Sequence, residues 1–200
     1  MAKIICFEGV HGSGKGTLID FFLRELGAAY TGRYEVIRDS EYPEFERVKS
    51  DIRAGVLSDK REIITTVAET RAQIYLKHIN HRLNALDLAI LDRSYYTSAV
   101  WQSDSFGEMY HIIDENERRG VPRADLTFIL FAPPEVIRDR LTSRRRHDVS
   151  EHSITGLLRD QLKYLHLAEN CEECVAFDTN GEPAELAREV YKLILANNAL

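Results

Sequence analysis

Short apolar runs alternate along the chain with longer stretches in which apolar residues recur every three or four positions. The runs at 4–7, 89–91 and 127–131 are continuous, which is typical of strands buried on both faces of a sheet. The longer stretches have the period of helices that cover such a sheet. This alternation predicts an α/β fold with a five-stranded parallel sheet and helices on both faces.

The expected elements follow from these runs. We expect strands at 3–8, 34–38, 88–92, 125–131 and 175–177. We expect helices at 15–26, 43–54, 60–84, 95–119, 133–143, 150–169 and 183–196. No repeat, low-complexity tract or Pro/Gly-rich linker interrupts them, so the sequence predicts one domain over residues 1–200. Its most polar segment, 143–150, is predicted to be a short arginine-rich lid.

The composition is that of a globular chain, with 44% apolar and 29% charged residues. A formal charge of −6 argues against a nucleic-acid partner, because the binding surface for one is normally basic. No window approaches the roughly 20 apolar residues that a membrane span needs. The apolar run at the start is too short for a signal peptide. We therefore expect a cytoplasmic protein without nucleic-acid or membrane partners.

The most informative segment, residues 9–17, reads Gly-Val-His-Gly-Ser-Gly-Lys-Gly-Thr and follows a predicted strand. A glycine-rich loop between a strand and a helix turns backbone N–H groups toward a phosphate, and the helix N-terminus adds partial positive charge. Lys15 is expected to reach the β- and γ-phosphates of ATP. The loop residues expected to hold ATP are Gly9, Val10, His11, Gly12, Ser13, Gly14, Lys15, Gly16 and Thr17.

The same loop changes the expected magnesium site. Gly16 stands where a serine or threonine hydroxyl normally contacts Mg²⁺, and Thr17 follows one position later. The resulting Gly-Lys-Gly-Thr resembles the loop of adenylate kinases. Asp92 and Arg93 end another buried run, at the sheet edge where open α/β folds bind ligands. We expect Asp92 and Thr17 to hold Mg²⁺, partly through water, and Arg93 to hold a phosphate.

Arginines gather in and just after the predicted helix 133–143. Those of the lid would balance the negative charge that phosphoryl transfer spreads over the moving group. Arg138 is expected on a solvated helix face instead. The predicted catalytic set is Lys15, Asp92, Arg93, Arg144 and Arg146, and the further arginines expected to contact ATP are Arg140 and Arg145.

Together these segments resemble the thymidylate kinase family over most of the chain. The matching motifs are Phe7-Glu8-Gly9 through Lys15, Glu69-Thr70-Arg71-Ala72-Gln73, Asp92-Arg93-Ser94, Ser98-Ala99-Val100-Trp101-Gln102, Asp125-Leu126-Thr127 and Pro133-Pro134-Glu135-Val136. The resemblance implies a three-layer P-loop kinase fold and a homodimer. It also implies transfer of the ATP γ-phosphate, with Mg²⁺, to the 5′-phosphate of a deoxynucleoside monophosphate. By position in the family, Arg71 and Gln102 would face the acceptor nucleotide.

The acceptor side departs from the family pattern at several positions. His11 replaces an aspartate that contacts the sugar, Val67 a phenylalanine that stacks on thymine, and Ser94 an aromatic residue. Tyr42 either supplies the missing aromatic face or lies in the core or on the surface. dTMP is the leading acceptor, and the base and sugar stay open. The residues expected to bind the acceptor are His11, Arg38, Tyr42, Val67, Arg71, Arg93 and Gln102.

Two other functions fit parts of the sequence. A deoxynucleoside kinase needs a carboxylate to take the proton from a sugar hydroxyl, and Asp39 and Glu41 are the candidates for it. Arg71 argues against this function, because a nucleoside brings no phosphate for it to hold. An inactive nucleotide-binding switch protein is the alternative of another class, and it would bind ATP without phosphorylating any acceptor.

The chain has three cysteines, Cys6, Cys171 and Cys174. The spacing of the last two is that of half a zinc site, and a structural zinc site usually needs a second pair of ligands. His166 is the only candidate nearby in the sequence, and Cys6 belongs to a predicted core strand. The sequence therefore favours ordinary reduced thiols over a zinc site.

Overall fold

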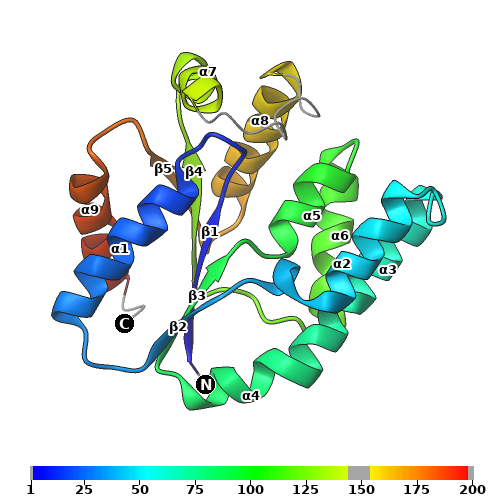
Figure 1. Ribbon diagram of the computed structural model, residues 1–200, viewed down its shortest axis with the longest axis horizontal. Coiled ribbons are helices and arrows are strands. Elements are labelled where there is room, and N and C mark those ends of the chain that lie inside the picture. Colours follow the sequence, from blue (N-terminus) through cyan, green and yellow to red (C-terminus); the bar gives the residue numbers. More distant parts are fainter. Residues whose placement is uncertain (1, 144–153, 198–200) are drawn as a thin grey trace. The chain divides into compact units, whose positions relative to one another are not determined.

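The computed structural model describes residues 2–143 and 154–197, and its ribbon is drawn in Figure 1. The described strands are β1 (Lys3–Glu8), β2 (Tyr34–Ile37), β3 (Leu88–Asp92), β4 (Leu126–Phe131) and β5 (Cys174–Asp178). They form one sheet in the order β2-β3-β1-β4-β5. The predicted α/β fold with a five-stranded parallel sheet is thereby confirmed.

Helices join the strands. Those described are α1 (Lys15–Ala29), α2 (Pro43–Arg53), α3 (Lys60–Ile74), α4 (Asn80–Ala85), α5 (Tyr95–Gln102), α6 (Phe106–Arg118), α7 (Pro134–Ser143), α8 (Ile154–Asn170) and α9 (Pro183–Ala196). A 3₁₀ turn at Asp39–Glu41 precedes α2. A π-helical turn at Tyr75–Ile79 joins α3 to α4 without a break. The predicted helix 60–84 is thus one continuous helical run with a single wide turn inside it.

The contacts of the chain divide it into two compact units. The first comprises Met1–Ile4 and Arg33–Ala124, and the second comprises Ile5–Gly32 and Asp125–Leu200. The assignment of the whole chain to one domain stays a prediction.

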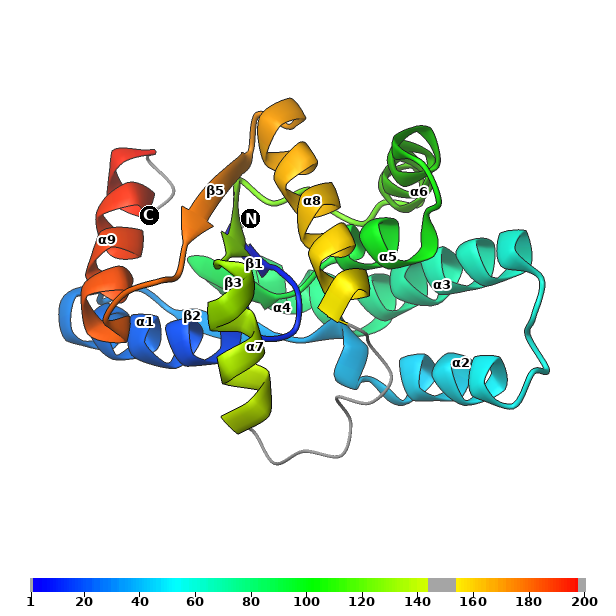
Figure 2. The ribbon, with the colours of Figure 1, turned by 90° about the horizontal axis from the view of Figure 1, so that it is seen from above.

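The first unit is built on the parallel pair β2 and β3, in which Tyr34 lies opposite Leu88 and Ile37 opposite Leu91. Its helices pack mainly on α3, which contacts α2, α5 and α6. Figure 2 shows α2 and α3 side by side. The loops that follow β2 and β3 lead directly into the polar segments from which acceptor residues were predicted.

The second unit contains the parallel pairs β1–β4 and β4–β5. Helices α1 and α9 pack against each other, and α8 packs on β4 and β5. Figures 1 and 2 show α1 and α9 on one side of these strands and α8 on the other. The aromatic core includes Phe7 stacked on Phe128 at 5.3 Å between ring centroids, with Phe22 and Phe177 at its edges. This core fixes β1, from which the glycine-rich loop starts.

The prediction of one helix over 95–119 is wrong. Helix α5 ends at Gln102, and α6 begins at Phe106. The Ser105 side chain accepts a hydrogen bond from the Glu108 backbone N–H at 3.2 Å, and the Glu108 carboxylate accepts one from the Asp104 N–H at 2.6 Å. Ser105 and Glu108 thus form the Ser-x-x-Glu capping pattern that starts a helix. That pattern is visible in the sequence, but it lies within a stretch whose apolar residues keep a helical spacing throughout.

Candidate functional site

The glycine-rich loop connects β1 to α1 as the sequence predicted. Gly14 is the N-cap of α1 in a left-handed conformation, with φ of 85° and no side-chain cap. The first turn of α1 contains no acidic residue that would neutralise its N-terminus. Uncapped N–H groups and the positive end of the helix dipole therefore point to an anion site, as a phosphate requires.

Gly9 allows the loop to pass close to the end of β4. Its φ is 150°, and a Cβ atom at this position would lie 2.6 Å from the carbonyl oxygen of Leu130. Real side chains do not tolerate that contact, so the loop keeps this path only with glycine here. Gly16 differs, because a Cβ there would meet no atom within 4 Å. Space alone therefore does not explain why Gly16 replaces the usual serine or threonine.

Ser13 supplies an observation that fits a bound phosphate. Its side chain is fully buried, and its hydroxyl has no hydrogen-bond partner among the residues that the structure describes. Buried hydroxyls are normally satisfied, so this one is suited to hydrogen-bond a ligand in the loop. Lys15 stands two positions on, half-buried at the start of α1.

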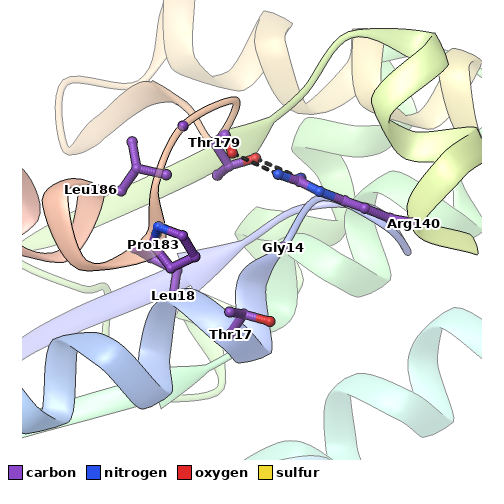
Figure 3. Close-up of a pocket in the computed structure, with 8 residues that line it drawn as sticks. Gly14, Thr17, Leu18, Arg140, Thr179, Pro183 and Leu186 are labelled. Carbon is purple, nitrogen blue, oxygen red and sulfur yellow. Dashed lines mark hydrogen bonds between the residues drawn. The ribbon is translucent and has the colours of Figure 1, made fainter. Parts of the chain in front are cut away.

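Arg140 of α7 and Thr179, which follows β5, both form hydrogen bonds with the glycine-rich loop (Figure 3). Arg140 donates from Nη1 to the Thr179 hydroxyl at 3.1 Å and to the Gly12 carbonyl at 3.3 Å, and from Nη2 to the Thr179 carbonyl at 2.7 Å. The Thr179 hydroxyl donates to the Ser13 carbonyl at 2.7 Å, and it lies 3.0 Å from the Phe131 carbonyl. Thr179 is therefore the point where the glycine-rich loop, β4 and α7 meet.

A hollow of about 130 Å³ opens beside this junction. Figure 3 shows Arg140 and Thr179 on one side of it and Pro183 and Leu186 on another. The residues that line it are Gly14, Thr17, Leu18, Arg140, Thr179, Gly181, Pro183 and Leu186. The sequence analysis predicted Arg140 and Thr17 but missed Thr179. The available signal was the position of Thr179 after the last predicted strand, at the ligand-binding edge of a parallel sheet.

The first unit contains a separate cavity of about 300 Å³, within the range of small-ligand sites. Four predicted acceptor residues, Val67, Arg71, Arg93 and Gln102, come together in its wall. The full lining consists of Asp39, Ser40, Phe45, Val48, Lys49, Ile52, Val67, Arg71, Arg93, Ser94, Thr97, Ser98, Trp101 and Gln102. Residues from four separate segments thus converge on one cavity.

Arg71 is a buried cation in this wall. Its guanidinium donates to Asp39 at 2.6 Å, to Asn116 at 2.9 Å and to Ser98 at 3.0 Å. The Phe45 ring covers the guanidinium at 5.0 Å from its centroid. Because the Asp39 carboxylate balances its charge, Arg71 contributes little net charge to the cavity.

Arg93 contrasts with Arg71. It adopts a φ of 78°, and it is the one residue other than glycine with positive φ in the described ranges. Its Nη1 donates to the Thr97 hydroxyl at 3.1 Å, and its guanidinium lies 5.7 Å from the Trp101 ring centroid. No carboxylate pairs with it in the part of the chain that the structure describes. A strained backbone that presents an uncompensated cation is typical of a functional position.

Asp92 is held by Arg38, whose Nε donates to its carboxylate at 2.8 Å. Arg38 also lies 3.7 Å from Glu41. Arg38 and Glu41 line a second hollow of about 230 Å³ rather than the cavity of Arg93. The structure therefore places Arg38 apart from the four predicted acceptor residues that line the cavity.

Tyr42 also lies outside the cavity. Its ring stacks on His78 at 5.3 Å between centroids, and its hydroxyl accepts a hydrogen bond from Arg82. Glu35, hydrogen-bonded to Arg82, holds the pKa of this guanidinium above its usual value. The aromatic side chains in the cavity wall are instead Phe45 and Trp101, which the sequence analysis did not single out as acceptor contacts. Nothing in their spacing distinguishes them from core residues.

Gln102 has a carbonyl oxygen (Oε1) that is buried and has no hydrogen-bond partner within the described residues. Because Gln102 lines the cavity, this acceptor is suited to a donor group on a ligand. His11 is exposed in the glycine-rich loop, and Arg138 is exposed on α7, as predicted for a solvated face. Arg144, Arg145 and Arg146 lie outside the described residues, as does the predicted lid beyond Ser143.

The comparisons with known proteins agree on one family. The family model described as thymidylate kinase matches residues 7–190. A thymidylate kinase of Leptospira borgpetersenii is 22% identical over 193 residues, covering 96% of this chain and 93% of the relative. A probable thymidylate kinase 1 of Saccharolobus solfataricus is 27% identical over 201 residues, covering 98% and 99%. A probable thymidylate kinase of Pyrobaculum aerophilum is 26% identical over 191 residues, covering 95% of each chain.

None of the described helices combines the length and the apolar character that crossing a bilayer requires.

Thr179→Val tests the junction beside the glycine-rich loop. Valine keeps the shape of threonine but removes the hydroxyl that the Ser13 carbonyl and Arg140 Nη1 share, while the Thr179 backbone carbonyl still accepts from Arg140 Nη2. We expect the Kd for ATP to rise about tenfold, with a loss of roughly 1–3 kcal/mol in the free energy of unfolding. Thr179→Ser keeps the hydroxyl and is expected to keep ATP affinity. Equal ATP binding by the valine and serine variants, measured by calorimetry, would contradict this role.

Proposed function

Because the chain belongs to the thymidylate kinase family, we propose that it transfers the γ-phosphate of ATP to the 5′-phosphate of dTMP, giving dTDP and ADP. The observation that carries the proposal is the family match over residues 7–190, which includes both the glycine-rich loop and the cavity around Arg93. The names of the relatives support dTMP as the acceptor.

The donor role falls to the second unit. The N–H groups of the loop and of the α1 N-terminus bind the phosphates of ATP, with Lys15 on the β- and γ-phosphates and the Ser13 hydroxyl as a further donor. Arg140 lies beside this loop on α7 and contacts the same nucleotide. Little covalent chemistry is needed in phosphoryl transfer, so these residues act by positioning and by charge.

We also propose that Asp92 and Thr17 hold magnesium, which the family implies. Asp92 and Thr17 offer hard oxygen ligands, and Mg²⁺ takes few protein ligands and keeps several waters. When bound, Mg²⁺ neutralises phosphate charge during transfer. Arg38 orients the Asp92 carboxylate from the side through its 2.8 Å hydrogen bond.

The acceptor role falls to the cavity of the first unit. We assign the 5′-phosphate of dTMP to Arg93, because its charge is not balanced by a carboxylate. From the sequence, Arg71 was expected to hold the acceptor phosphate together with Arg93. Because Asp39 already neutralises the charge of Arg71, we assign Arg71 to the base instead, where a polar contact needs no net charge. Gln102 Oε1 accepts a hydrogen bond from the N3–H of thymine. Arg144 and Arg146 are proposed to balance the charge on the transferred group.

The structure weakens the case for a deoxynucleoside kinase. The Asp39 carboxylate, one candidate base, is 4% exposed and bound to Arg71 at 2.6 Å. Glu41, the other candidate, lies on the hollow of Arg38 rather than in the cavity. Neither carboxylate is therefore available to take a proton from a sugar hydroxyl in that cavity. A homodimer and a cytoplasmic location stay predictions.

Production of ADP tests the function directly. The purified chain with ATP and Mg²⁺ is expected to release ADP with dTMP and not with thymidine. Lys15→Ala is expected to lower kcat by about 100-fold or more, because a charged donor to the phosphates is lost. Lys192→Ala, on the exposed face of α9, serves as the control and is expected to match the unaltered protein. Turnover of thymidine alone would overturn the proposal.

Trp101 provides a test of the acceptor cavity. It replaces the aromatic face that Val67 lacks, and stacking of a base on an aromatic ring contributes about 1–3 kcal/mol. We expect Trp101→Ala to raise the KM for dTMP about 5- to 150-fold while the KM for ATP stays unchanged. Trp101→Phe is expected to retain most of the affinity. Phe106→Ala removes an exposed aromatic side chain outside the cavity and serves as the control. An unchanged KM for dTMP in Trp101→Ala would rule out stacking.

A further inference from the structure

The turn that joins α8 to β5 has a tightly fixed backbone. The Cys171 N–H donates to the Leu167 carbonyl at 2.9 Å, and the Cys174 N–H donates to the Cys171 carbonyl at 3.0 Å. The Glu173 carbonyl accepts a hydrogen bond from the N–H of Thr127 in β4 at 2.7 Å. Helix, turn and sheet therefore each hold one part of this four-residue segment.

Three side chains of this turn come together. The sulfur atoms of Cys171 and Cys174 and a carboxylate oxygen of Glu173 all lie within 4.8 Å of one another. Cys174 is 5% exposed, and the other two are half-buried. In a tetrahedral zinc site with Zn–S bonds of about 2.3 Å, two sulfur ligands lie about 3.8 Å apart. The 4.8 Å limit on the three atoms is thus about 1 Å wider than the ligand spacing of such a site.

This arrangement was not predicted from the sequence, because a second pair of cysteine or histidine ligands was expected for zinc. The third ligand is a carboxylate from inside the Cys-x-x-Cys motif itself. Two thiolates and one carboxylate are a ligand set that zinc accepts, with water in the fourth position.

The charge around the turn favours a cation. Residues 167–178 contain four carboxylates and no lysine, arginine or histidine. The last turn of α8 has no basic residue, so the negative end of its dipole is not compensated there. A cation at this turn would be attracted both by these carboxylates and by the C-terminal end of α8, whereas a disulfide would leave this negative charge uncompensated.

We propose that Cys171, Glu173 and Cys174 bind a thiophilic divalent cation, with Zn²⁺ as the ion that this ligand set favours. Binding releases the two thiol protons to solvent, because the thiolates are the ligands. The ion ties the end of α8 to the first residue of β5. Strand β5 then leads to Thr179, which holds the glycine-rich loop. The site does not depend on the proposed kinase function.

Cobalt provides a spectroscopic test with the full-length chain, reduced and freed of metal. One equivalent of Co²⁺ is expected to produce a near-ultraviolet thiolate-to-cobalt charge-transfer band and the intense visible bands of four-coordinate cobalt. Adding one equivalent of Zn²⁺ is expected to bleach both. Zn²⁺ is also expected to raise the Tm, because it binds the folded chain. None of these signals requires enzymatic activity.

Matched variants assign the ligands. Cys171→Ser and Cys174→Ser are each expected to lose about half of the charge-transfer intensity, and the double variant is expected to lose the band completely. Glu173→Gln is expected to weaken Zn²⁺ binding at least about tenfold. Glu172→Gln changes the exposed neighbouring carboxylate and is expected to bind as the unaltered chain does. Cys6→Ala is expected to keep the spectrum, because that thiol lies in β1.

Three results would overturn the proposal. The first is the absence of a charge-transfer band in the reduced, unaltered chain. The second is a band that survives in the double cysteine variant. The third is equal Zn²⁺ affinity in Glu173→Gln and Glu172→Gln, which would remove the carboxylate from the site. If the first result is accompanied by a decrease in protein mass of two hydrogens on air oxidation, the two cysteines form a disulfide instead of a metal site.

Discussion

The close approach of the glycine-rich loop to the end of β4 is the constraint on which the donor half of the molecule depends. A side chain at Gly9 would collide with the Leu130 carbonyl at 2.6 Å. With glycine there, the loop reaches a position in which the Ser13 carbonyl lies 2.7 Å from the Thr179 hydroxyl. Arg140 then binds the same threonine and the loop backbone. The absence of a side chain at Gly9 thus allows the loop to form its hydrogen bonds with Thr179 and Arg140.

The acceptor half depends on whether a carboxylate neutralises the charge of each of two arginines, Arg71 and Arg93. Arg71 is buried with Asp39, so its charge is neutralised within the wall of the cavity and the pair stabilises that wall. Arg93 has no such partner in the described residues, and its positive φ of 78° shows that the backbone is strained to place it. Such strain persists only where the surrounding structure enforces it. This division supports one arginine for the phosphate and one for the base, which the sequence could not distinguish.

The sequence predicted the strands closely because three of them contain continuous apolar runs, and β1 and β3 have the predicted bounds. It predicted the loop from Gly9 to Thr17 because those residues are adjacent in the chain. The break between α5 and α6 was missed because a local cap at Ser105 interrupts a continuous apolar period. Phe45 and Trp101 were missed for another reason: their roles come from packing between distant segments, and their spacing in the sequence does not reveal it. Thr179 could have been found from its position directly after the last predicted strand. Tyr42 was considered for its ring alone, and its hydrogen bond with Arg82 places it elsewhere.

The most direct test of the account is a pair of glycine substitutions in the same loop, measured for ATP affinity by calorimetry and for stability by urea unfolding. Gly9→Ala is expected to abolish measurable ATP binding and to cost at least about 1–3 kcal/mol, because both its φ and its contact with Leu130 exclude a side chain. Gly16→Ala meets no atom within 4 Å and is expected to keep both properties, with up to about 1 kcal/mol of added helix stability. Unchanged ATP affinity and stability in Gly9→Ala would contradict the central claim that this approach sets the donor site.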